Sequence, residues 1–178
     1  MANETSIDEQ LSEALERADA DSRHARVERI KWLSLHERRP GAILGRTETM
    51  RILSEARETF IDGHFVAALL LATSFIEHTL AEELQLLGHV TDSPNFANAV
   101  AIARKHKVFP EDWLARTDAL RLKRNPFSHL KEPDHKHNMG VRFRKLRIHP
   151  MRMLEADAKD AIGLMWDYFV ATLREADA

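Results

Sequence analysis

The chain has 178 residues, which is the usual size of one domain, and 44% of them are hydrophobic while 30% are charged. This composition can fill a core and argues against wholesale disorder, and the absence of cysteine excludes disulfide scaffolds, thiolate zinc sites and cysteine nucleophiles. The formal net charge is only −2, yet residues 101–152 carry 14 Lys or Arg against five Asp or Glu. Charge sorted in this way indicates either a surface that meets a polyanion or a solvated loop that neutralises acidic segments of the same fold.

The N-terminus and the hydropathy pattern give no sign of export or of membrane insertion. No apolar stretch follows residues 1–5, so no signal peptide is expected. The longest apolar stretch, residues 65–76, is shorter than the roughly 18 residues that suggest a membrane span. We therefore expect a cytoplasmic domain without a membrane partner.

The first 45 residues are expected to form two helices. Ser6 and Glu9 have the spacing of a capping box, in which a hydroxyl and a carboxylate satisfy free amides of the first turn. A thin apolar stripe predicts a solvated, acidic helix over residues 6–20, and a second helix is expected over residues 22–37. The segment that contains Pro40 ends it, because proline removes a hydrogen-bond donor.

The middle of the chain predicts the core of a helical bundle. Apolar residues at helical spacing predict an amphipathic helix from Thr47 to a stop at Gly63. The next helix, over residues 65–87, begins with eight apolar residues and is therefore expected in the middle of the bundle. Gly88 is expected to end it.

Three further helices are expected in the C-terminal part of the chain. Ser93 is expected to cap the first, which ends near Lys107, and Pro110 opens the second. The last helix is expected over residues 154–173. Residues 141–148 alternate in part between apolar and polar types, which leaves a short hairpin or an extended arm as an open alternative there, although no segment is a convincing strand. No other segment resembles a strand, so the expected fold class is all-α.

Residues 124–129, Arg-Asn-Pro-Phe-Ser-His, form the most informative motif of the chain. In an unbroken helix, five steps of about 100° would rotate His129 about 140° away from Arg124. Pro126 disfavours helical dihedral angles at Asn125, so we expect Asn125 to be an N-cap and Pro126 to begin a new helix. His129 would then lie in a first turn, where unpaired amides point outward and favour an anion such as phosphate.

This expected arrangement suits the cleavage of RNA. The partial positive charge of a helix N-terminus favours the neutral, base-competent form of His129, and the planar guanidinium of Arg124 can clamp two phosphate oxygens. Transesterification of RNA requires a base for the 2′-hydroxyl, an acid for the leaving 5′-oxygen and a cation for the charged phosphorane. No metal is required. The alternative is that the segment has only a structural capping role.

The motif resembles the R-x(4–6)-H signature of HEPN domains, which often carry a polar residue directly after the arginine, here Asn125. The helix order is also similar to that family. Residues 60–68 look like the turn of its first helix pair, residues 74–84 look like the end of its second helix, and residues 157–173 resemble its closing helix.

The resemblance covers residues 47–175. It implies an all-α, HEPN-like antiparallel helical bundle over residues 46–178, preceded by an N-terminal helical extension over residues 1–45. It also implies a metal-independent endoribonuclease, of the kind found in toxin–antitoxin and antiphage defence systems, without a cofactor. The active sites of that family are commonly composite, so the implied partners are RNA, a second copy of the chain and an antitoxin or regulatory protein.

Carried over from the family, four residues receive roles in this site. The resemblance makes His129 the general acid or base and Arg124 the phosphate clamp. Asn125 would orient one of them or the substrate, and Glu77 would hold Arg124. One departure concerns the members that an antitoxin adenylylates on a tyrosine two residues after the histidine. That position is Lys131 in this chain, so control of this kind is not expected.

A basic stripe on both sides of the motif is expected to follow the RNA backbone by charge and stacking, or else to remain solvated. Its residues are Lys123, Lys131, Lys136, Arg142, Arg144 and Lys145.

Two other functions compete with RNA cleavage. The first is a non-catalytic HEPN-like regulator that binds RNA or protein, in which the motif only shapes an interface. The second is a metal-dependent phosphohydrolase, whose metal site would use nitrogen and oxygen ligands. Its candidate ligands are His129, Asp134, His135, His137 and His149.

Overall fold

A computed structural model describes residues 6–37 and 46–173 of the chain. Within these residues it contains seven helices, α1 to α7, and no strand, so the predicted all-α class is confirmed. The described residues before Glu37 form one compact unit, and those from Glu37 onward form a second. The predicted stop at Pro40 lies outside the described residues.

The first unit is the helix α1 (Ile7–Leu33), which runs unbroken for 27 residues. Its capping box is confirmed, because Ser6 Oγ accepts the amide of Glu9 at 3.2 Å and the Glu9 carboxylate accepts the amide of Ser6 at 2.8 Å. The predicted division into two helices, over residues 6–20 and 22–37, is wrong. No proline or glycine interrupts residues 7–33, so the backbone hydrogen bonds continue through the expected gap.

The second unit begins with a helix pair that follows the prediction. α2 (Thr47–Asp62) ends at Gly63, whose φ of 84° lies in the left-handed region where glycine carries no Cβ penalty. α3 (Phe65–Leu86) follows and packs against α2. Gly88, with a φ of 71°, again terminates the helix.

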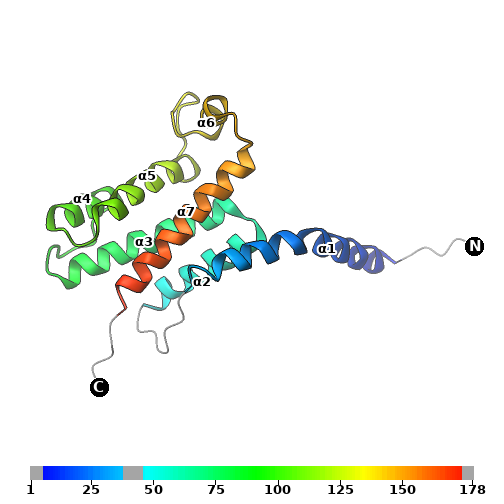
Figure 1. Ribbon diagram of the computed structural model, residues 1–178, viewed down its shortest axis with the longest axis horizontal. Coiled ribbons are helices and arrows are strands. Elements are labelled where there is room, and N and C mark those ends of the chain that lie inside the picture. The colour runs from blue at the N-terminus through cyan, green and yellow to red at the C-terminus, as the bar shows by residue number, and fades with distance from the viewer. Residues whose placement is uncertain (1–5, 38–45, 174–178) are drawn as a thin grey trace, which may run out of the picture. The chain divides into compact units, whose positions relative to one another are not determined.

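The core lies where α3 meets α7 (Pro150–Ala171), and the two helices are side by side in Figure 1. α7 begins four residues before the predicted start, because His149 Nδ1 accepts the amide of Met151 at 3.3 Å and Pro150 occupies the first helical position. The face predicted to be buried is buried, with at most 6% of each residue exposed. It consists of Ala158, Ile162, Met165, Trp166 and Phe169.

By length and composition, α3 is the one described helix that could cross a membrane. More than half of its most apolar stretch, 56%, is buried inside the protein. This burial agrees with the prediction that the helix occupies the middle of the bundle.

Two helices cover one side of α3. α4 (Phe96–His106) is capped by Asn95, whose Oδ1 accepts the amide of Asn98 at 3.0 Å, and not by Ser93 as predicted. The predicted end near Lys107 is confirmed. α5 (Glu111–Ser128) begins directly after Pro110 and contacts α3, α4 and α7.

The segment expected to be a hairpin or an arm is a short helix, α6 (Met139–Leu146). The prediction for residues 141–148 is therefore wrong. Arg142 on α6 donates a hydrogen bond to the buried carboxylate of Asp157 on α7, and a contact 15 residues away along the chain is not encoded in local alternation.

Candidate functional site

The proline of the motif lies inside a helix. α5 continues through Pro126 to Ser128, and His129 is its C-cap, with its amide donating to the carbonyl of Asn125 at 2.8 Å. The predicted N-cap at Asn125 and the new helix at Pro126 are therefore wrong. The outward-pointing amides expected beside His129 are also not there, so phosphate binding at a helix N-terminus is not available in this motif.

The reason for this difference is tertiary packing. The inner face of α5, Leu114, Thr117 and Leu120, is at most 1% exposed. Packing of this face against three other helices holds α5 in place, and Pro126 lies only in the last turn. The hydrogen bond that Pro126 cannot donate in the last turn costs less free energy than breaking the packed helix would.

Arg124 is held from two sides. Its Nη2 donates to Glu77 Oε2 on α3 at 2.9 Å, and its Cζ lies 5.5 Å from the centroid of the Phe96 ring on α4. The Arg124 side chain is 17% exposed and that of Glu77 is 29% exposed. The ion pair that the resemblance implied between these two residues is thus present, while sequence reasoning missed Phe96. The Nε of Arg124 is buried without a hydrogen-bond partner among the described residues.

His129 lies at the opposite end of the motif and is exposed to solvent. No hydrogen bond or ion pair between described residues joins it to Arg124 within one copy of the chain. Its neighbours Ser128 and Leu130 are exposed as well, and Leu130 is fully so. The imidazole of His129 is therefore accessible to a large substrate or to a second protein molecule.

A second charged cluster lies beside the motif, around Asp157. This residue is 3% exposed, and its carboxylate accepts a hydrogen bond from Arg142 on α6 and contacts Lys123 Nζ on α5 at 2.9 Å. Two of the cations predicted to contact RNA thus hold three helices together. Sequence reasoning missed Asp157, although an acidic residue directly before the buried face of α7 was the signal for it.

His137, in the turn before α6, faces the same cluster. Burial lowers the pKa of its imidazole, and the nearby cations Lys136, Arg142 and Lys123, together with His135, lower it further. Its Nε2 is buried without a hydrogen-bond partner among the described residues. Burial and the surrounding cations thus both disfavour the protonated form of His137.

The other predicted RNA-contacting residues lie at the surface. Lys136, Arg144 and Lys145 are exposed and Lys131 is half-buried. Within residues 6–37 and 46–173, none of these four forms an ion pair. They are therefore available to a polyanion, in contrast to Lys123 and Arg142.

The alternative metal site does not assemble. Across the described parts of the chain, no group of three or more His, Asp or Glu side chains is arranged to hold a metal ion. His135 and His137 do approach each other, with ring centroids 5.6 Å apart.

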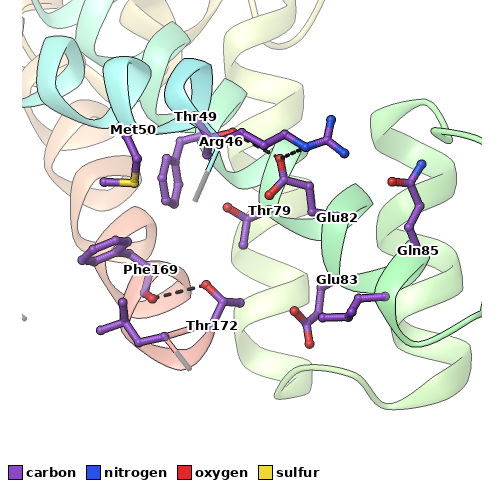
Figure 2. Close-up of a pocket in the computed structure, with 12 residues that line it drawn as sticks. Arg46, Thr49, Met50, Thr79, Glu82, Glu83, Gln85, Phe169 and Thr172 are labelled. Carbon is purple, nitrogen blue, oxygen red and sulfur yellow. Dashed lines mark hydrogen bonds and ion pairs between the residues drawn. The ribbon is translucent and has the colours of Figure 1, made fainter. Parts of the chain in front are cut away.

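Figure 2 shows a cavity of about 470 Å³ between the start of α2 and the ends of α3 and α7. Arg46 Nε lies 3.4 Å from Glu82 Oε1, and the hydroxyl of Thr49 donates to the same oxygen at 3.2 Å. A second cavity of about 520 Å³ shares these three residues and extends to Glu77. Its charged lining is mostly acidic, with Glu48 in addition, so it is unsuited to phosphate and we place no RNA contact in it.

Comparison of the chain with protein-family models, with curated proteins and with solved structures finds no match. The resemblance to HEPN domains therefore depends on the motif and the helix order, and it stays a hypothesis.

Proposed function

We propose that this chain is a metal-independent endoribonuclease of the HEPN type, which acts in the cytoplasm as a homodimer in a toxin or antiphage defence system. The observation that supports it best is the fixed guanidinium of Arg124 in the same short motif as an exposed imidazole. Glu77 orients the guanidinium at 2.9 Å, and Phe96 supports it from the other side.

In the proposed reaction, the 2′-oxygen of a ribose attacks the adjacent phosphorus and the bond to the 5′-oxygen breaks. His129 of one copy removes the proton of the 2′-hydroxyl, and His129 of the second copy protonates the departing 5′-oxygen. Arg124 stabilises the charge of the phosphorane, and Asn125 orients the reacting groups. The products are a 2′,3′-cyclic phosphate and a free 5′-hydroxyl.

The dimer is part of this proposal for a geometric reason. Arg124 and His129 lie five residues apart at the end of one helix, and no contact joins them within a single copy. A base and an acid on opposite sides of one phosphate require two imidazoles. The exposed position of His129 at the end of α5 leaves it free to meet its counterpart in a second copy.

The test is incubation of the purified protein with single-stranded RNA in EDTA. We expect cleavage with cyclic phosphate ends, and a rate lowered on the order of 10²-fold or more by His129→Ala, because general acid–base catalysis contributes at least this factor. His64→Ala is the matched control, since His64 is exposed and its side chain makes no capping bond. Cleavage that survives in His129→Ala, or that requires a divalent metal, would contradict the proposal.

A second candidate is a non-catalytic HEPN-like regulator that binds RNA or protein. The observation in its favour is that Arg124 is only 17% exposed and already bound to Glu77, as a residue that shapes an interface would be. This alternative predicts that the protein binds RNA without cleaving it. It also predicts that Arg124→Ala lowers the binding affinity by the same factor in the wild-type protein and in the His129→Ala variant.

A further inference from the structure

An exposed apolar seam runs along α1. At about 100° per residue, Ile7, Leu11, Ala14, Ala18 and Ala25 fall within a sector of about 60° on the helix surface. All of them are exposed, with Ile7 at 76% and Leu11 at 58%. Leu15, at 70%, widens the seam to about 100°, which is the width of the apolar stripe that a helix normally buries.

The charges that flank the seam change sign halfway along the helix. Residues 7–21 contain six acidic residues and only one basic residue, Arg17. Residues 22–33 contain four basic residues and only one acidic residue, Glu28. α1 is therefore complementary in charge to a second α1 that runs in the opposite direction, whereas a parallel copy would place the acidic halves against each other.

Ion pairs within α1 involve only some of its charged residues. Glu13 lies 3.9 Å from Arg17 and Asp19 lies 3.2 Å from Arg26. Asp8, Glu16 and Asp21 form no ion pair with any described residue, so the N-terminal half keeps an acidic excess at its surface.

The sizes of the seam residues also fit an antiparallel copy. If the two helices cross with Ala18 at the two-fold axis, Leu11 of each faces Ala25 of the other, and Ala14 faces Ser22. In the layer of Leu11 and Ala25 a large side chain then meets a small one, and the layers at Ala14 and Ala18 contain only small side chains, which lets the helices approach closely. The seam is about 30 Å long, because residues 7–25 rise about 1.5 Å each.

We propose that α1 docks antiparallel against α1 of a second copy of this chain through the seam of Ile7, Leu11, Ala14, Leu15, Ala18 and Ala25. The contact is isologous, so it closes with two copies and does not extend into a filament. It does not depend on the proposed ribonuclease activity, since it uses no residue of the motif.

The first test is the oligomeric state of the full chain by analytical ultracentrifugation at micromolar concentration. We expect a dimer, and a dissociation constant raised at least tenfold by Leu11→Asp, which places a charge in the seam. Val27→Asp is the matched control, because Val27 is exposed at 41% and lies about 160° from Leu11 around the same helix. A monomeric wild type, or a dimer equally stable in Leu11→Asp, would overturn the proposal.

The second test fixes the direction, and the absence of cysteine makes it specific. Leu11→Cys and Ala25→Cys proteins are mixed, oxidised and mapped by mass spectrometry. Antiparallel docking predicts a disulfide between positions 11 and 25 in the mixture, and none in Leu11→Cys alone. A disulfide in Leu11→Cys alone, or a dimer without the mixed disulfide, would overturn the antiparallel seam whatever the outcome of the RNA cleavage assay.

Discussion

Tyr168 and Thr117 form a polar pair inside the bundle. Tyr168 is 0% exposed, and its hydroxyl lies 3.0 Å from Thr117 Oγ1, which is equally buried. Burial raises the pKa of Tyr168 to about 12, although the hydrogen bond between its hydroxyl and that of Thr117 acts in the opposite direction. Tyr168 is the only tyrosine of the chain, and its phenol lies inside the bundle.

The raised pKa predicts a loss of stability in alkaline solution. Above pH 10 the unfolded chain loses the phenolic proton while the folded chain keeps it, so the free energy of unfolding falls between pH 10 and about pH 12. At pH 11 the raised pKa lowers the free energy of unfolding by about 1.4 kcal/mol relative to neutral pH, an amount equivalent to one pKa unit. Urea denaturation at pH 9 and pH 11 measures it, and Tyr168→Phe should show a smaller fall. An equal fall in both proteins would contradict the assignment to Tyr168.

Helices α5, α6 and α7 are connected through one carboxylate. Asp157 on α7 binds Lys123 of α5 and Arg142 of α6. α6 makes no extensive packing contact with another described helix. We infer that its position depends on this ion pair more than on apolar burial.

Asp157→Asn should therefore destabilise the protein and release α6. Removing the charge leaves two partly buried cations without a counter-ion, and breaking such a pair costs about 3 kcal/mol. Denaturation with urea measures the loss, and hydrogen exchange should show the protection of α6 amides falling first. The control is Asp160→Asn on the same helix. Its partner Arg116 is half-exposed at 39%, so we expect a loss of less than about 1 kcal/mol. Equal losses in the two variants would refute a special role of Asp157.

Charge is separated along the whole molecule. Residues 101–152 carry nine more positive than negative charges, and the remaining residues carry eleven more negative than positive. In the fold, two of these cations, Lys123 and Arg142, form ion pairs with the buried carboxylate of Asp157. The number of basic residues that remain at the surface to contact a polyanion is therefore smaller than the sequence count suggests.

If the four surface cations of the predicted stripe each neutralise one phosphate, RNA affinity should depend on salt with a slope of about −3 in log K against log salt. The double variant Arg144→Gln, Lys145→Gln should reduce this slope by about 1.4 without changing the fold. Fluorescence anisotropy at several salt concentrations measures it. Lys31→Gln, Arg51→Gln, which removes two exposed cations outside the stripe, is the control. A slope that both double variants reduce equally would argue against the stripe.

Short-range chemistry accounts for the elements that the sequence predicted. The capping box at Ser6, the left-handed end at Gly63 and the buried face of α7 depend on residues within a turn or two of each other. The errors lie where distant residues decide. α5 passes through Pro126 because its inner face is packed, and α6 is helical although its residues alternate.

The sequence by itself determined the all-α class, most helix boundaries and the motif at Arg124 and His129, because local propensity and apolar periodicity are properties of neighbouring residues. Only the tertiary structure decided that the ring of Phe96, 28 positions away along the chain, lies against Arg124, and that His129 ends a helix instead of beginning one. It also decided that Lys123 and Arg142 form ion pairs with Asp157. The physical reason is that a buried charge must find a partner wherever packing places one, and packing depends on the whole chain.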